Sequence, residues 1–206
     1  MTTKRWVVIG AGPSLTVEDV NAVRGEKVCV INTGYQIAPW ADLLYACDAQ
    51  WWDWHKDSPE LLAFKGEKWT QTAGWEEHGP MLAKILPKHA ISVRASKPGE
   101  GIAECGPIFQ GANSGIQAIN LVYQLHRPEQ IILLGYDMQG SQTKPRWHGK
   151  HPSGVVCSNW HAWVPLYDAV ARDAKRLGVE IVNCSRETAL TCFPRARLED
   201  YLQTPS

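Results

Sequence analysis

The stretch RWVVIGAGPSL, residues 5–15, decides the fold. A short apolar run of β type leads directly into a glycine-rich turn, and a helical stripe follows it. A buried strand, a tight turn and a helix in this order are typical of the first unit of an α/β domain with a parallel sheet.

The same alternation continues along the chain. It predicts strands at Arg5–Ile9, Lys27–Ile31, Asp42–Ala46, Ala90–Arg94, Gln130–Leu134 and Val179–Asn183. Amphipathic spacing predicts helices over 113–126 and about 160–177, the second beginning near residue 162 because proline is tolerated only near a first turn. We expect one α/β domain over 1–206, with a mostly parallel sheet of about six or seven strands flanked by helices. Long loops are predicted at its carboxyl edge, over 95–112 and 139–158.

Composition restricts the function classes. The 206 residues carry 21 Lys and Arg against 21 Asp and Glu, so the formal net charge is zero, which argues against a general basic nucleic-acid binder. No apolar run approaches the roughly 18 residues that span a bilayer, and the start shows no signal-peptide pattern. The six cysteines form no CxxC motif. We therefore expect a cytoplasmic protein without a disulfide framework or a membrane partner.

Small and polar residues gather where ligands of an open parallel sheet bind, beyond the carboxyl ends of the strands. They are Gly10, Gly12, Pro13, Ser14, Asn32, Asp48 and Asp137, with Asn113, Ser114 and Gly115 at the start of a helix. Turn amides and a helix N-terminus favour an anion such as a phosphate. The plain alternatives are a ligand-free turn, a helix N-cap at Asn113 or Ser114, and turn capping by the two aspartates.

The first turn does not fit a dinucleotide fingerprint. A GxGxxG motif requires a third glycine where this chain has Leu15, and an acidic residue after the second strand where it has Asn32. A mononucleotide or another phosphate ligand is favoured over NAD. The tryptophan cluster at 51–54 is expected to pack in the core or under a loop more than to stack on a base.

A second polar group lies late in the chain. His148, His151, Cys157 and His161 are residue types that bind zinc, but their spacing matches no established zinc pattern, so we assign no metal ligand. We expect these histidines to divide between phosphate contacts, solvent and one general base, because imidazole exchanges a proton near neutral pH.

Three segments resemble a known family. GAGPSL after the first strand, Asn32 after the second, and NSGIQAINLVYQLHRPEQIILLGYDM at 113–138 resemble the bacterial sialyltransferases of the GT-A-like type, which have a single Rossmann-like domain. That family has a G-N-G-P-S-L turn, a T-S-G helix start and a strand that ends G-I-D-F. This chain departs from it with Ala11 for the asparagine, Gly111 for an arginine and Gln139 for a tyrosine.

The resemblance implies a glycosyltransferase that uses a nucleotide-sugar donor without a metal. Gly10–Ser14, Asn32 and Ser114 would hold the nucleotide, and His161 would be the general base. His148 or His151 would stabilise the negative charge on the leaving group. The acceptor stays open among a glycan, a metabolite and a modified nucleic acid, and so does a homo-oligomeric state.

The same motifs resemble, more distantly, the pterin diphosphokinase-like proteins related to motility accessory factors. That resemblance implies ATP- and Mg²⁺-dependent pyrophosphoryl transfer, for which Asp48 and Asp137 would matter more than His161. A non-catalytic nucleotide-binding module is the third alternative.

Overall fold

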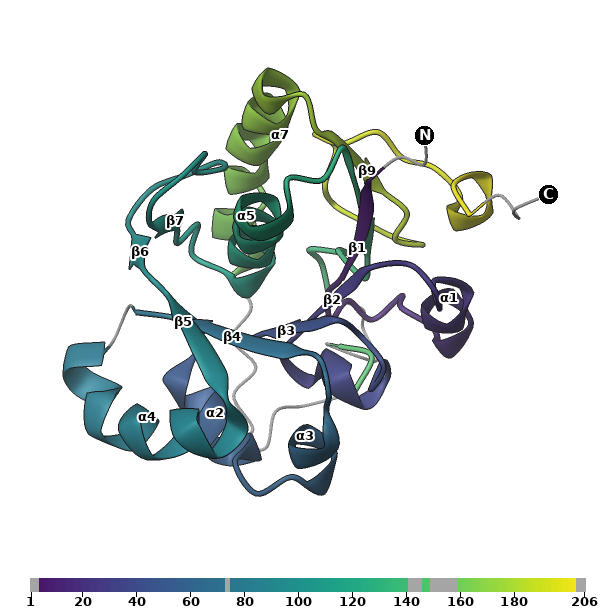
Figure 1. The fold of residues 1–206 in the computed structure, drawn as a ribbon. Coiled ribbons are helices and arrows are strands. Elements are labelled where there is room, and N and C mark those ends of the chain that lie inside the picture. The colour runs from purple at the N-terminus through teal and green to yellow at the C-terminus, as the bar shows by residue number, and fades with distance from the viewer. Residues whose placement is uncertain (1–3, 73–74, 141–145, 149–158, 203–206) are drawn as a thin grey trace.

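A seven-stranded sheet runs through the protein (Figure 1). The computed structural model describes residues 4–72, 75–140, 146–148 and 159–202. The strands are β1 (Arg5–Ile9), β2 (Val28–Ile31), β3 (Leu43–Tyr45), β4 (Glu67–Gln71), β5 (Ile91–Arg94), β8 (Gln130–Leu134) and β9 (Glu180–Asn183). Their spatial order is β5-β4-β3-β2-β1-β8-β9, and every neighbouring pair is parallel. The predicted Rossmann-like α/β fold is confirmed.

The strand order reverses next to β1. The chain runs outward from β1 to β5 and then crosses back to β8, which pairs with the other edge of β1 in the register Val7↔Ile132. In open α/β sheets such a reversal leaves a crevice at the carboxyl ends of the strands. The fold therefore directs attention to the segments that follow β1 and β8.

Helices cover both faces of the sheet (Figure 1). One face packs against α1 (Val17–Ala22), α2 (Ala49–His55), α3 (Pro59–Ala63) and α4 (Trp75–His89). The other packs against α5 (Ser114–His126) and α7 (Leu166–Leu177), and the short α6 (Trp160–Trp163) precedes α7. Two 3₁₀ turns, Asn32–Gln36 and Leu198–Asp200, complete the helical segments described.

Alternation along β1 explains why its sequence is apolar throughout. Trp6 and Val8 pack with α5 and α7, whereas Val7 and Ile9 pack with the helices of the opposite face. Successive side chains of a strand point to opposite faces, so a strand covered on both sides is apolar at every position.

Two predicted loops and one predicted helix differ from the structure. The stretch 95–112 contains a small parallel pair, β6 (Ser96–Lys97) with β7 (Ile108–Phe109). Residues 141–145 and 149–158 of the second predicted loop lie outside the described residues. The helix expected over 160–177 is divided into α6 and α7, because Pro165 has no N–H to continue the ladder of the first helix.

Several elements were not predicted, among them β4 and α4. β4 reads EKWTQ and has an exposed first residue, so it lacks the apolar run that marks the other strands. α4 contains Pro80 and Pro87, which normally interrupt a helical pattern. In the described part of the chain, no helix is long and apolar enough to cross a membrane.

His89, at the end of α4, makes the stability of this face depend on pH. Its Nε2 lies 2.7 Å from the Lys56 carbonyl oxygen and therefore donates to it, while Nδ1 is buried without a hydrogen-bond partner. Burial lowers the pKa of His89 below its ordinary 6.5. The folded state thus favours the neutral ring, and its stabilisation is complete above pH 6.5 and is lost as the pH falls below that value.

We expect the urea concentration at the midpoint of unfolding to be lower at pH 5.5 than at pH 7.5, and this decrease to be smaller in His89→Gln. A glutamine amide can still donate to the Lys56 carbonyl but does not titrate. Urea titrations of both proteins at the two pH values provide the measurement, and an unchanged pH dependence in the variant would show that His89 contributes nothing to it.

Candidate functional site

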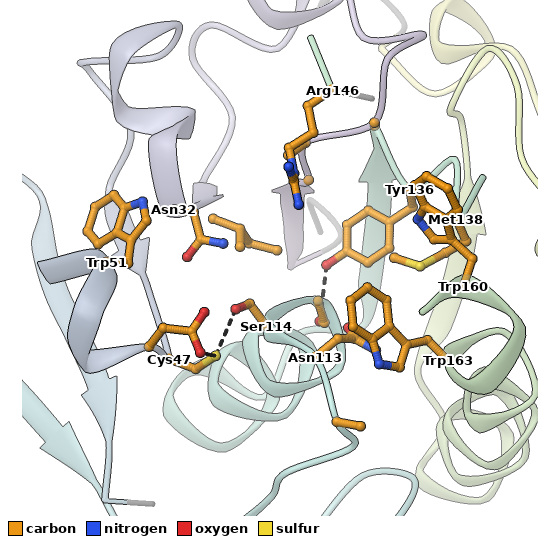
Figure 2. Close-up of a pocket in the computed structure, with 18 of the residues that line it drawn as sticks. Asn32, Cys47, Trp51, Asn113, Ser114, Tyr136, Met138, Arg146, Trp160 and Trp163 are labelled. Atoms are coloured by element: carbon orange, nitrogen blue, oxygen red, sulfur yellow. Dashed lines mark hydrogen bonds between the residues drawn. The ribbon is translucent and has the colours of Figure 1, made fainter. Parts of the chain in front are cut away.

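A cavity of about 690 Å³ opens at the carboxyl edge of the sheet (Figure 2). Its wall is built by the turn after β1, the ends of β2 and β3, the first turn of α5 and the segment after β8, with side chains from α2, α4 and α6. This volume lies within the usual range for small-molecule sites. The cavity is therefore the candidate functional site.

Most of the predicted site residues line this cavity. They are Gly10, Gly12, Pro13, Asn32, Asp48, Asn113, Ser114 and Gly115. The remaining predicted residues, Ser14, Asp137, His148 and His161, are not part of its lining. The sheet edge thus brings the small and polar residues together, as the sequence predicted, but not the expected histidine base.

The turn after β1 uses its amides within the protein. Gly10 N–H donates to the Leu134 carbonyl at 2.7 Å, and Gly12 N–H donates to the Gly135 carbonyl at 2.8 Å. Ser14 N–H donates to the Asp137 carboxylate at 2.8 Å. These amides have acceptors already, so the turn forms a wall of the cavity rather than the cradle of open N–H groups that the sequence suggested.

Asp137 is a structural carboxylate. It is buried, and besides the Ser14 amide its side chain accepts from the Ser14 hydroxyl at 2.9 Å. Burial raises the pKa of Asp137, and the two bonds from Ser14 oppose that rise. The expectation of a turn-capping aspartate describes this geometry better than a catalytic role does.

The first turn of α5 presents its amide end to the cavity. Asn113 is the N-cap, and its side-chain oxygen accepts from Ile116 N–H at 3.1 Å and from the Tyr167 hydroxyl at 3.0 Å. The Ser114 hydroxyl lies 3.0 Å from the Cys47 sulfur. Desolvation raises the pKa of the Cys47 thiol far above its usual range, so the sulfur stays protonated at neutral pH and is no nucleophile.

Three residues of the cavity wall have left-handed backbone. They are Asn32 with φ of 51°, Ala112 with φ of 55° and Met138 with φ of 47°. Residues other than glycine adopt this conformation at a cost, and such residues cluster at functional sites. Each lies in a different segment, after β2, before α5 and after β8, so three separate parts of the cavity wall contain a residue in this conformation.

Arg146 supplies the positive charge of the cavity. Figure 2 shows its side chain pointing into the cavity, with Ser114 on the opposite wall. Burial lowers the pKa of the guanidinium, but arginine remains a cation near neutral pH. A cation facing the N-terminal turn of a helix favours an anionic group between them.

Orientation on α6 explains why His161 is not in the lining. Trp160 and Trp163 both line the cavity, and residues three apart share one face of a helix. His161 is exposed and lies about 100° around the helix from Trp160. Its predicted role as a base has no support from this position.

Other titratable side chains do reach the cavity. Asp48 is exposed at the N-cap position of α2 without a capping hydrogen bond, and His78 lines the cavity from α4. His78 was missed because its helix was not predicted. Arg146 was not predicted as a site residue, since no strand or helix of the sequence places it at the sheet edge.

The structure describes two of the four residues considered as zinc ligands, His148 and His161. His151 and Cys157 lie outside the described residues, and His148 packs edge-on against Trp147 with ring centroids 5.2 Å apart. Among the residues that the structure describes, no three His, Cys, Asp or Glu side chains form a group that could hold a metal.

The tryptophan cluster at 51–54 divides between two roles. Trp51 and Trp52 are buried in the core, as expected, although Trp51 also contributes to the cavity wall. Trp54 lines the cavity, and Trp160 and Trp163 line it from α6. Figure 2 shows Trp160 and Trp163 on one side with Tyr136 and Met138, and Trp51 with Asn32 on the other.

Gly12 is required by packing inside the protein. A Cβ there would lie 2.1 Å from Asp137 Oδ1 and 2.7 Å from the Gly135 carbonyl oxygen. We expect Gly12→Ala to lower the free energy of unfolding by about 1–3 kcal/mol, whether or not ligand is present. A side chain at this position therefore disturbs the fold itself, besides any effect on a ligand in the cavity.

The matched control is Gly79→Ala on α4, where a Cβ meets no atom within 4 Å other than its chain neighbours and the backbone of its own helix. That variant should change the free energy of unfolding by less than about 1 kcal/mol, because the gain in helix propensity is opposed by the contact of the new Cβ with the ring of the following Pro80. Urea unfolding measures both variants. Equal stability of Gly12→Ala and the parent would contradict the packing role.

The cavity combines a cation, a helix N-terminus, two flanking sets of indole rings and two titratable side chains at one sheet edge. These features together suit a small molecule with an anionic centre and flat ends. Comparison of the chain with protein-family models, with curated proteins and with solved structures found no match.

Proposed function

We propose that this protein is a transferase that binds a nucleotide-activated small molecule in the cavity and transfers the activated group, a sugar, to an acceptor hydroxyl. The observation that carries the proposal is that Arg146 and the first turn of α5 face each other across the cavity, which also has aromatic side chains in its walls. Polar groups converging in a largely apolar pocket are the usual signature of a small-molecule site.

The phosphates of the donor occupy the middle of the cavity. Arg146 and the Ser114 hydroxyl approach this position from opposite walls, and the partial positive charge of the α5 N-terminus adds to the attraction. The amides of Gly10, Gly12 and Ser14 are engaged elsewhere, so charge rather than a glycine-rich cradle holds the phosphate. The same positive groups stabilise the negative charge that the leaving nucleotide acquires.

The transfer step requires one proton acceptor. The acceptor hydroxyl oxygen bonds to the activated carbon, the bond from that carbon to the phosphate oxygen breaks, and the hydroxyl proton passes to a base. A general base must lie within hydrogen-bond reach of that proton. Asp48 and His78 line the cavity and are the candidates for this base, whereas His161 is exposed and is not part of the lining.

The pyrophosphoryl-transfer alternative has less support. It relies on two carboxylates for Mg²⁺, and Asp137 is committed to Ser14. Of the described residues that line the cavity, Asp48 alone carries a carboxylate. Activity that survives EDTA would support glycosyl transfer, and formation of AMP from ATP would support the alternative.

Arg146→Gln should weaken the binding of nucleoside diphosphates and nucleotide sugars by about tenfold or more, since a hydrogen bond to a charged group contributes about 1.5–3 kcal/mol. Raising the salt concentration should also weaken binding by the parent protein. Calorimetric titration of the nucleotides that raise the melting temperature in a thermal-shift screen measures both effects.

Arg172→Gln serves as the matched control, because Arg172 is an exposed cation on α7 and does not line the cavity. It should bind nucleotides as the parent does. Equal loss in the two arginine variants, or no thermal shift with CMP, UDP, GDP, ATP or their sugar conjugates, would refute the proposed site.

Substitution of the base should lower kcat by roughly 10²–10⁴ while the affinity for the nucleotide changes little. We expect this effect from Asp48→Asn or His78→Gln, and His161→Ala should turn over like the parent. Steady-state kinetics with the donor found in the screen distinguish the three. A large loss confined to His161→Ala would overturn this assignment and restore the one that the resemblance implies.

A further inference from the structure

We propose that the donor lies across the cavity in one direction, with its nucleobase stacked on the indole rings of Trp160 and Trp163 and its transferable group toward Asp48 and His78. The inference rests on the proposed function and deepens it, because it assigns the two ends of the cavity to the base and to the acceptor.

The sheet order gives the cavity two distinct ends. Asp48 follows β3, Gln71 ends β4 and His78 lies on α4, which follows β4, so these residues belong to the β3–β4 side. Met138 follows β8, and Trp160 and Trp163 precede β9, so they belong to the β8–β9 side. β1 and β2 lie between the two sides, and Figure 2 shows Arg146 between Trp51 on one side and Met138 with Trp160 on the other.

The β8–β9 side has the chemistry of a stacking surface. Trp160 and Trp163 share one face of α6 and direct half-buried indoles into the cavity. The ring of Trp160 lies against the backbone at Gly140, where a Cβ would approach the ring to 2.6 Å. Rings held in place by the fold lose little entropy when a base stacks on them, and stacking tolerates any base.

The opposite side has the chemistry of the transfer step. Asp48 and His78 are the described lining residues that can accept a proton near neutral pH, and both lie on the β3–β4 side. The acceptor hydroxyl must meet such a group, so the acceptor occupies this side. With the phosphates between Arg146 and Ser114, the remaining part of the donor, its base, extends toward the tryptophans of α6.

The orientation is tested by comparing ligands with and without a base. Trp160→Ala and Trp163→Ala should each weaken the binding of nucleoside diphosphates by about 5- to 100-fold, while the binding of inorganic pyrophosphate stays unchanged. Trp160→Phe, which keeps an aromatic ring, should recover most of the affinity. Trp54→Ala, which removes an indole from the other side of the cavity, should weaken the binding of nucleotides less than either α6 variant does.

Calorimetric titrations of each variant, after circular dichroism has shown that it is folded, separate the outcomes. Loss of nucleotide binding in Trp54→Ala but not in the two α6 variants would show the reverse orientation and overturn the inference alone. Equal loss of pyrophosphate and nucleotide binding in the α6 variants would also overturn it, since the rings would then support the phosphate site. A parent protein that binds neither pyrophosphate nor any nucleotide would refute the proposed function itself.

Discussion

Two hydrogen bonds from Ser14 to Asp137 hold together the part of the sheet edge around which the cavity is built. They join the end of β8 to the turn after β1, the two strands at which the order of the sheet reverses. Burial of a carboxylate without hydrogen-bond partners would cost free energy. The Ser14 amide and hydroxyl satisfy Asp137, and the same two hydrogen bonds fix the conformation of the turn after β1. Gly12 is compatible with that closeness because it has no Cβ.

This closure changes how an anion can bind. When a glycine-rich turn donates its amides to β8 and to Asp137, the positive charge for a phosphate has to come from elsewhere. Arg146 and the N-terminal turn of α5 provide it from opposite walls of the cavity. The motif after the first strand is therefore a structural junction next to the cavity, and the groups that we propose to contact a ligand come from later segments.

The sequence predicts the framework well and the orientation of side chains poorly. Apolar runs identify β1, β2 and β8, because strands buried on both faces leave no polar position, and the residues after them do line the cavity. β4 and α4 could not be recognised from the sequence, because β4 is polar and α4 contains two prolines, and His78 was missed with α4. His161 was predicted at this edge, and it lies on the separate helix before Pro165, where its side chain is exposed and is not part of the cavity lining.

The left-handed residues explain how one sheet edge can carry two different surfaces. Asn32, Ala112 and Met138 each cost of order 1 kcal/mol or more in backbone strain, and each redirects the chain where a segment reaches the cavity. In the arrangement that we propose, the end with Trp160 and Trp163 receives the base and the end with Asp48 and His78 receives the acceptor, with Arg146 between them. A reaction that joins two different molecules requires such a separation, since each reactant needs its own surface while the bond that breaks stays between them.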